Sequence, residues 1–546
     1  MNTSCVQKSI ALIVLGALVA CSSGSGGNSS GPAQILPAHR AMPAQSALSK
    51  IVGVGDSLTA GYQSDGFLGE TGVRNPFYTG YFRQIPPNQE NGWWALLEEQ
   101  ASGLSLEDAI AQVYDPSTSP LPLIRGPGLD NQIIPTNNIY DPIGQFKGTD
   151  PCTFDGSFNQ AGFGLRTSAR VRLNPNASTI RDFGIPGITL HEANAIHQPP
   201  TDTCSPLPGI PGLLNDVVSE ESGTFWPVLR NFAYLGGNLT EVTAAASVHP
   251  TLATVWLGAN DVLKYMGSGG RFVGGDRTPG QVETDLRSTV STLEQAGAHV
   301  VLANLPNVLY AGYFQRVTVP KSPKDCALAS YATCVLKLAS IEGFVPQIAH
   351  EYGLGTPNGC IPTSLTKPCG YLTLPALFLI IQYYDAYGQL PNLDCAQPAP
   401  NCKAVPGSGL GANYITPQFA AEVQALNNAV NQGIDNTATA MSLPLVDVYT
   451  IFNGLASADP SNPYFRLAAS IQPGVCCYIG YLAGIFSFDG IHPSNTGYAL
   501  VAYEFIATIN KAYGTHIPQV DYVAAYNGTR CNVQRYCFPD PYAPHP

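Results

Sequence analysis

The sequence predicts an α/β fold in which helices flank a parallel sheet. Three short apolar segments, at residues 50–55, 251–257 and 300–305, are rich in Val, Ile and Leu, as buried parallel strands are. Helical patterns at 279–296 and 417–436 alternate with such segments. Strands that alternate with helices favour a parallel sheet over an antiparallel one.

Further elements of the same kinds follow along the chain. Strands are predicted at about 180–189 and 443–449, and helices at 93–102, 328–350, 374–387 and 495–513. The apolar helix at 374–387 fits either the core or a lipid-facing lid, and the core is the commoner use of such a run. Gly- and Pro-rich stretches place long insertions at about 63–165, 198–248 and 306–416.

The composition limits the partners. The chain has 546 residues, of which 45% are hydrophobic and only 12% charged, against a usual charged fraction of about 25%. The formal net charge is −12 and no long basic run occurs, so a nucleic-acid partner is not expected.

The first twenty residues predict a signal peptide. Lys8 precedes an apolar run at 10–20 that is short for a transmembrane helix. The run ends in Leu18-Val19-Ala20-Cys21, which resembles the lipobox of bacterial lipoproteins and implies a lipid on Cys21; the alternative is an ordinary signal peptide with a chance cysteine. Residues 21–47 then form a flexible tether. Because Ser22 is not aspartate, the expected location is the outer membrane or the cell surface.

The cysteine count agrees with export. Without Cys5 and Cys21, twelve of the 14 cysteines remain, and an even number in an exported chain indicates disulfides. The candidate local pairs are Cys326/Cys334, Cys360/Cys369, Cys395/Cys402 and Cys531/Cys537, and Cys152/Cys204 is a longer one. No CxxC pair occurs and histidine is sparse, so neither a metal nor a cofactor is expected. The predicted domain is 48–515, followed by a tail at 516–546.

The segment from Ile51 to Tyr62 carries the first functional signal. An apolar strand turns at Gly55 and delivers Asp56 and Ser57 at its end, where open α/β sheets place their ligands. A helix is expected after Ser57, so nearby backbone N–H groups could face an anion. The alternative is that Ser57 or Asp56 only caps that helix.

Other chemically useful residues also follow predicted strands or open helices. Acyl transfer needs a nucleophile, a base, a group that orients the base, and donors for the oxyanion. Ser57 supplies a hydroxyl and His492 a base near neutral pH, and Asp489 is close enough in sequence to orient the imidazole. Gly187 can offer its N–H and Asn260 its side-chain amide to an oxyanion.

At these positions the sequence resembles a known family. Gly55-Asp56-Ser57-Leu58 matches the signature of the GDSL, or SGNH, hydrolases. The other family blocks follow in order as Gly184–Gly187, Gly258-Ala259-Asn260-Asp261 and Asp489-Gly490-Ile491-His492. The resemblance implies a three-layer α/β/α fold related to flavodoxin, with esterase or lipase activity.

The resemblance also implies a role for each matched residue. Ser57 is the nucleophile and a backbone oxyanion donor, Gly187 and Asn260 complete the oxyanion hole, His492 is the general base and Asp489 orients it. Asp182 stands where the family's glycine block usually opens with asparagine. Of the two candidate glycines, Gly187 is preferred over Gly184 because Ile188-Thr189 follows it, as in the family.

Rival motifs are weaker. The one GxSxG match, at 27–31, lies in the tether with no strand before it. His191-Glu192 with His197 has the wrong spacing for HExxH and is expected to cap a helix or to face solvent. Gly53 and Gly55 begin a dinucleotide fingerprint, but Leu58 replaces its third glycine.

The expected function is a lipid-anchored serine esterase or lipase with no cofactor. Aromatic residues in and near the insertions suggest a pocket for an apolar acyl group; they are Phe67, Tyr81, Phe82, Trp93, Trp226, Phe378 and Tyr383. The alternatives are a carbohydrate O-acetyl esterase and, in a different class, a surface binding protein on an inactive fold of this kind.

Overall fold

The computed structural model describes the parts of the chain that surround the predicted strands. The described residues are 48–62, 73–74, 82–83, 89–115, 117–123, 174, 177–195, 228–229, 239–267, 269–270, 272–311, 314–316, 364–373, 414–455, 486 and 491–522. The predicted signal peptide, the tether, and the helices at 328–350 and 374–387 lie outside them.

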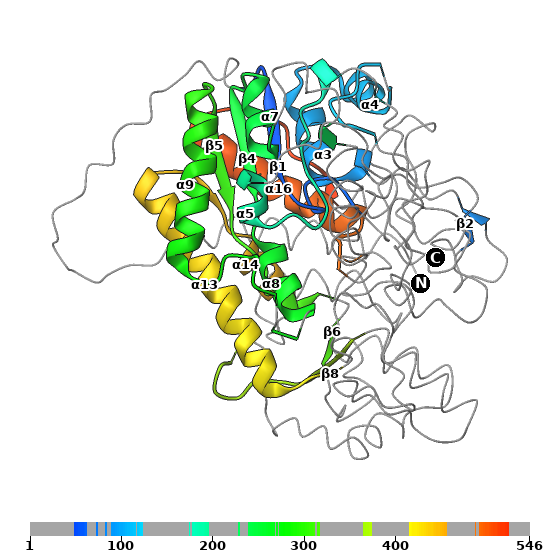
Figure 1. The fold of residues 1–546 in the computed structure, drawn as a ribbon. Helices are drawn as coiled ribbons and strands as arrows, with labels where there is room; N and C mark the ends of the chain where they lie inside the picture. Colours follow the sequence, from blue (N-terminus) through cyan, green and yellow to red (C-terminus); the bar gives the residue numbers. More distant parts are fainter. Residues whose placement is uncertain are drawn as a thin grey trace, which may run out of the picture.

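A four-stranded parallel sheet forms the core of the described part of the chain (Figure 1). Its order is β1 (Ile51–Gly55), β4 (Leu252–Trp256), β5 (His299–Ala303) and β9 (Leu445–Val446). Ile51 pairs with Leu252, and Leu252 in turn pairs with His299, so the first three strands are in register. The predicted strands at these places are confirmed, because apolar strands buried on both faces give continuous apolar runs.

The segment around Asp182 extends this sheet beyond β1. Asp182 forms a parallel bridge with Gly53, whose N–H donates to the Arg181 carbonyl oxygen at 2.9 Å. The N–H of Ile185 donates to the carbonyl oxygen of Gly55, also at 2.9 Å. With this segment as a fifth member, the spatial order is 2-1-3-4-5, which is compatible with a flavodoxin-like fold. The order reverses at β1, so Ser57 follows the strand at the topological switch point.

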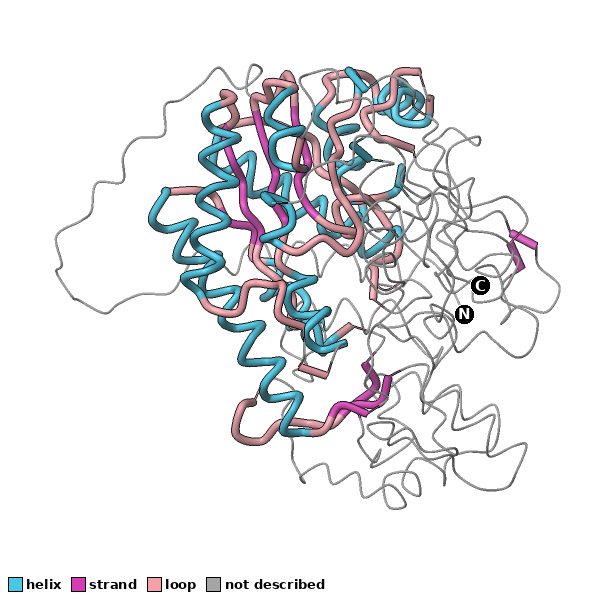
Figure 2. Tube along the Cα trace, viewed as in Figure 1, coloured by secondary structure: helices cyan, strands magenta, loops and turns pink. Residues whose placement is uncertain are grey.

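Two groups of helices pack on the sheet (Figures 1 and 2). One group holds α5 (Leu190–Ala195), α7 (Glu241–Ser247), α9 (Pro279–Gln295) and α13 (Pro417–Met441). The other holds α3 (Trp93–Ala101) and α16 (Asn495–Tyr513). Helices on a parallel sheet are what the alternating sequence pattern predicts.

Local signals in the sequence place the helix ends. Thr278 caps α9 through a reciprocal capping box with Gln281, and Gly297, at φ +104°, follows its end. Ser494 caps α16 by accepting from the N–H of Gly497. The predicted helices at 279–296 and 495–513 are therefore confirmed.

Trp93 belongs to the core and does not line the pocket. Its ring is fully buried, stacks on Phe505 with centroids 4.0 Å apart, and meets Trp256 edge-on at 5.9 Å. The expectation that Trp93 contacts substrate is wrong, because the first turn of α3 faces the sheet and not the carboxyl ends of the strands. Of the other aromatic residues expected there, none has a described side chain.

Shorter elements complete the described structure. They are α4 (Leu106–Tyr114), α8 (Ala259–Gly267), α14 (Val448–Leu455), the 3-10 helices η2 (Gln89–Asn91), η5 (Ala177–Thr179) and η7 (Val308–Tyr310), the pair β2 (Val73–Arg74) and β3 (Phe82–Arg83), and the sheet of β6 (Phe314–Arg316), β7 (Tyr371–Thr373) and β8 (Tyr414–Ile415). Within the described ranges, no helix has the length and apolar character needed to cross a bilayer.

Cys369 lies next to β7, is buried and takes part in a disulfide bond. Its predicted partner Cys360 and the other predicted cysteine pairs lie outside the described residues.

Candidate active site

A single tight turn presents Ser57 at the end of β1. The N–H groups of Thr59 and Ala60 donate to the Asp56 carbonyl oxygen, and Gly61 ends the turn at φ +68°. The helix expected after Ser57 is therefore wrong, since the left-handed glycine redirects the chain after one turn. Asp56 caps this turn by accepting from the N–H of Leu58 at 2.9 Å. The Ser57 side chain has no capping role here.

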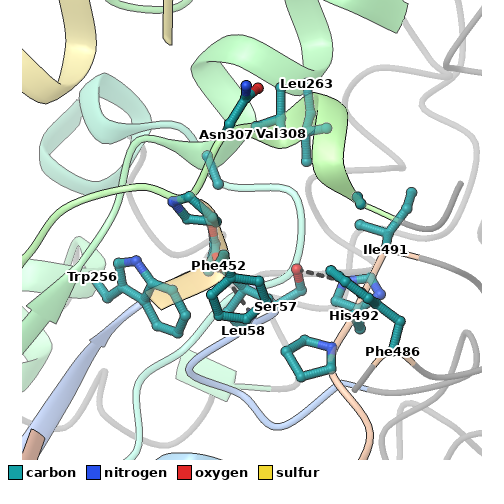
Figure 3. Close-up of a pocket in the computed structure, with 15 residues that line it drawn as sticks. Ser57, Leu58, Trp256, Leu263, Asn307, Val308, Phe452, Phe486, Ile491 and His492 are labelled. Atoms are coloured by element: carbon teal, nitrogen blue, oxygen red, sulfur yellow. Dashed lines mark hydrogen bonds between the residues drawn. The ribbon is translucent and has the colours of Figure 1, made fainter. Parts of the chain in front are cut away.

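The Ser57 hydroxyl instead contacts His492. Ser57 Oγ and His492 Nε2 are 2.8 Å apart, although 435 positions separate the residues in the chain (Figure 3). Each residue is 9% exposed. His492 lies two residues before Ser494, the cap of α16, and an antiparallel bridge between Phe486 and Pro493 holds the same loop. The structure thus joins the predicted nucleophile to the predicted base.

The other imidazole nitrogen is the one that an orienting carboxylate would contact. Because Nε2 faces Ser57, such a carboxylate would contact Nδ1. Asp489, the residue predicted to fill it, lies outside the described residues.

Tyr62 packs on the histidine ring and was not predicted. Its ring centroid lies 4.8 Å from that of His492, at an angle of 59°. The Tyr498 hydroxyl donates to the Tyr62 carbonyl oxygen at 2.8 Å, which fixes the backbone of Tyr62 on α16. Tyr62 directly follows Gly61, so the signal in the sequence was an aromatic residue at the exit of the motif's turn.

Asn260 connects the serine turn to the predicted oxyanion loop. It lies at the start of α8, directly after β4, and is 8% exposed. Its Nδ2 donates to the Ile188 carbonyl oxygen at 2.9 Å and to Asp56 Oδ2 at 3.2 Å. The amide therefore bridges the residue before Ser57 and the residue after Gly187.

The two candidate glycines differ in their surroundings. Gly184 N–H donates to Asp182 Oδ1 at 3.0 Å, and a Cβ on Gly184 would lie 2.4 Å from the backbone nitrogen of Ala60. Gly184 is thus a packing residue with an occupied N–H. Gly187 has φ +81° and open space where a Cβ would lie, and its N–H donates to nothing within the described part of the chain. Of the two N–H groups, that of Gly187 is the one available to a ligand.

Buried carboxyl groups surround the end of β1. Burial raises the pKa of Asp56 to about 6, against the lowering effects of the Leu58 N–H and of His492. Burial also raises the pKa of Asp182 to about 8 and that of Glu241 well above its usual value. Glu241 Oε1 accepts from the N–H of Gly55 at 2.6 Å. Through hydrogen bonds from the N–H groups of Gly55, Leu58 and Gly184, these carboxyl groups hold the backbone of β1 and of the segments beside it.

Asp182→Asn is expected to stabilise the protein at alkaline pH. With a pKa of about 8 when folded and 3.8 as its ordinary value, Asp182 binds its proton more tightly in the folded state. Its contribution to the free energy of unfolding therefore falls as pH rises from about 4 towards 8. Asparagine keeps an oxygen for the Gly184 N–H without this loss, so the gain at pH 8 is on the order of 1–3 kcal/mol. Thermal unfolding at pH 5 and pH 8 measures it.

Glu294→Gln is the matched control for that measurement, because Glu294 is an exposed acid near the end of α9. The melting temperature of the Glu294→Gln variant should differ from that of the wild type by the same amount at pH 5 and at pH 8. Parallel pH curves for Asp182→Asn and the wild type would contradict the prediction.

A largely apolar pocket adjoins Ser57 and His492. It encloses about 560 Å³, counting the part open to solvent. Its other lining residues are Asp56, Leu58, Trp256, Ala259, Leu263, Pro306, Asn307, Val308, Ala311, Phe452, Phe486, Ile491 and Pro493. Figure 3 shows Phe452, Phe486 and Ile491 around the pair. Most of these residues follow the ends of β4, β5 and β9, and no motif in the sequence marks them as pocket residues.

The weaker motifs take structural roles. A Cβ on Gly53 would lie 2.6 Å from the Trp94 ring, and one on Gly55 would lie 2.0 Å from Thr59 Oγ1. The lack of a side chain at Gly53 and Gly55 allows this close packing, so the two glycines are explained without a dinucleotide-binding role. His191 and Glu192 lie on α5, where the His191 side chain is 57% exposed, as expected. His197 and the predicted lipidation site Cys21 lie outside the described residues.

Comparison of the chain with protein-family models, with curated proteins and with solved structures gives no match. The chemistry of this site therefore has to be inferred from its own geometry. That geometry is a hydroxyl hydrogen-bonded to an imidazole beside an apolar pocket. Nearby lie a glycine N–H with no acceptor among the described residues and a buried amide at the start of α8.

Proposed function

We propose that this protein is a serine esterase that hydrolyses carboxylic esters through an acyl-enzyme intermediate. The observation that carries the proposal is the 2.8 Å contact between Ser57 Oγ and His492 Nε2, at the carboxyl end of β1. The four sequence blocks that resemble the SGNH hydrolases support it. A lipid anchor on Cys21 and a location in the cell envelope are parts of the same proposal.

The steps follow from the positions of the groups. Ser57 Oγ attacks the ester carbonyl carbon while His492 Nε2 takes the hydroxyl proton. The tetrahedral intermediate expels the alcohol, which receives that proton from His492, and leaves an acyl group on Ser57. Water activated by His492 then releases the acid. In this proposal Asp489 orients His492, and the N–H groups of Ser57 and Gly187 and the Asn260 amide bind the oxyanion.

The pocket favours an apolar acyl group over acetate. Its walls next to Ser57 are mainly aliphatic and aromatic side chains. Each buried methylene contributes about 0.8 kcal/mol, so kcat/KM should rise by up to about fourfold per methylene until the pocket is full. A series of p-nitrophenyl esters from acetate to decanoate measures this dependence. Activity limited to acetate would instead favour a carbohydrate O-acetyl esterase.

Leu263→Trp tests whether this pocket holds the acyl chain. Leu263 lies on α8, is half-buried and lines the pocket, so indole should fill the space and lower the ratio of octanoate to acetate hydrolysis. Leu104→Trp is the matched control, since Leu104 is 50% exposed and does not line the pocket. Equal ratios in the two variants would count against this acyl site.

A fluorophosphonate probe separates an enzyme from a surface binding protein on an inactive fold. The wild type should be labelled, and the label should map to the peptide that contains Ser57, because a base-activated serine reacts with such probes. If the wild type stays unlabelled at pH 8, the catalytic proposal fails and the binding protein is favoured.

A further inference from the structure

A second cluster of ionisable side chains lies outside the proposed catalytic site. It consists of His191 on α5, Asp285 on α9, and Asp276 in the loop before α9. One possible ligand atom from each residue lies within 4.8 Å of those of the other two. His191 Nδ1 and Asp285 Oδ2 are 2.9 Å apart. This is the spatial arrangement of two oxygen donors and one nitrogen donor around a common point.

Asp276 is the member of the cluster that calls for an explanation. It is only 5% exposed, and its Oδ2 has no hydrogen-bond partner in the described part of the chain. A buried carboxylate oxygen without a partner is costly, and native proteins usually pair it or let it bind a metal. One of its two carboxylate oxygens lies within 4.8 Å of the possible donor atoms of His191 and Asp285, so the Asp276 carboxyl group is part of the cluster.

Within the cluster only His191, which contacts Asp285, can carry a positive charge, and the nearby lysine and arginine are engaged elsewhere. Lys264 Nζ is bound by Glu192 at 3.0 and 3.1 Å, and the Arg277 guanidinium lies over the Tyr265 ring at 5.1 Å. Among the described residues, no lysine or arginine pairs with Asp276. Asp261 and Asp285 bring negative charge close to the Asp276 carboxyl group, and a bound cation would offset that repulsion.

The frame that holds the donors is well connected. Asp261 Oδ1 accepts from the N–H of Asp276 at 2.7 Å, and its Oδ2 accepts from the N–H of Leu190 at 3.0 Å. Asn194 Nδ2 donates to the Asp285 carbonyl oxygen and to Thr289 Oγ1, which holds α5 against α9. The three donors therefore come from segments already fixed to one another, as a preformed metal site requires.

We propose that His191, Asp276 and Asp285 bind a divalent transition-metal ion, for which Zn²⁺ is the probe. An imidazole with two carboxylates suits Zn²⁺ better than Ca²⁺, which takes six to eight oxygen ligands. Zn²⁺ ligands lie at about 2.0–2.2 Å, so the donors have to move together slightly, and the exposed His191 ring can turn to do so. Because the His191 side chain is 57% exposed, water can reach an ion bound beside it and serve as a fourth ligand.

The bound ion would brace the start of α5. Leu190 opens α5 three residues after Gly187, and Asp261 follows Asn260 directly. A cation between α5 and the loop before α9 would therefore hold in place the backbone that carries Gly187 and Asn260. The site is thus structural and adjoins the proposed catalytic centre without sharing a residue with it.

Calorimetric titration of the full chain, first stripped with EDTA, tests the proposal. Zn²⁺ should bind the wild type and raise its melting temperature, and Ca²⁺ at the same concentration should do neither. Asp276→Asn and His191→Gln should each weaken Zn²⁺ binding about tenfold or more, since the loss of even an outer-shell partner often costs that much. Because the His191 side chain is exposed, the His191→Gln variant should fold like the wild type.

Glu294→Gln, an exposed acid on the same helix as Asp285, is the control and should bind Zn²⁺ like the wild type. The proposal is overturned if the wild type binds no Zn²⁺, in which case Asp276 and Asp285 share a proton instead. It is also overturned if Ca²⁺ binds in preference, or if both cluster variants keep wild-type affinity. None of these readouts depends on ester hydrolysis, so they are independent of the proposed function.

Discussion

Ser57→Ala is expected to lower kcat for ester hydrolysis on the order of 10⁴-fold or more, with little change in KM. The variant keeps the pocket and the imidazole but has no oxygen to form the acyl-enzyme. Ser57 is 9% exposed and its hydroxyl contacts His492, so the loss of one hydrogen bond costs only about 1 kcal/mol of stability. Steady-state kinetics on the best ester, together with thermal unfolding, measures both quantities.

Thr59→Val provides a matched control from the same turn. Thr59 is 1% exposed, and its Oγ1 has no hydrogen-bond partner in the described structure. Valine keeps the shape of threonine, so this variant loses a buried hydroxyl two residues from Ser57 without leaving a gap. It should hydrolyse esters at close to the wild-type rate. Equal losses in the two variants would mean that the turn was damaged and that Ser57 has no chemical role of its own.

The central strands were predictable because of where they lie. Leu252–Trp256 and His299–Ala303 are buried inside a parallel sheet, so their sequences are continuous apolar runs. The pairing of Asp182 with Gly53 was not predictable, because it depends on a few backbone hydrogen bonds at an edge. Caps such as Thr278 act within a few residues, so the ends of α9 could be placed from the sequence.

The candidate site was predictable only where its residues follow strands that the sequence pattern marks. Ser57 and Asn260 follow strands that the sequence marks clearly, and parallel strands bring their carboxyl ends to one edge. Tyr62 reaches the site through the turn at Gly61, and its only sequence signal is its place directly after that glycine. Phe452 reaches the site through α14, for which no sequence signal marks a pocket residue. Trp93 was misplaced because its aromatic character fits a core and a pocket equally well.

The geometry around Asn260 suggests how its amide could serve both the fold and the reaction. In this structure Nδ2 donates to the Ile188 carbonyl oxygen and to Asp56 Oδ2, which uses both of its hydrogens. The Asp56 contact is the longer one, at 3.2 Å against 2.9 Å, and the pKa of Asp56 is raised to about 6. An oxyanion would therefore compete with the Asp56 carboxyl group for the Nδ2 hydrogen of Asn260 that now points at Asp56 Oδ2.

Asn260→Ala is expected to lower kcat about 10²- to 10³-fold, as the loss of one oxyanion-hole donor typically does. It should also lower the free energy of unfolding by about 1–3 kcal/mol, because the Ile188 carbonyl oxygen loses its donor in a buried place. KM should change much less than kcat, since an oxyanion donor acts mainly in the transition state. Kinetics across the ester series and a urea unfolding curve separate the two losses.

Asn174→Ala controls for the structural part of this effect. Asn174 is fully buried, and its Nδ2 donates to the carbonyl oxygens of Ser119 and Leu121, as that of Asn260 does to Ile188. Both variants leave a backbone acceptor without its donor, so both should lose stability to a similar extent. Only Asn260→Ala should lose kcat, because the hydrogen bonds described for the Asn174 amide go to Ser119, Leu121 and Thr179, which belong neither to the Ser57 turn nor to the loop at Gly187. If the two variants lose kcat equally, the amide of Asn260 supports the loops and does not bind an oxyanion.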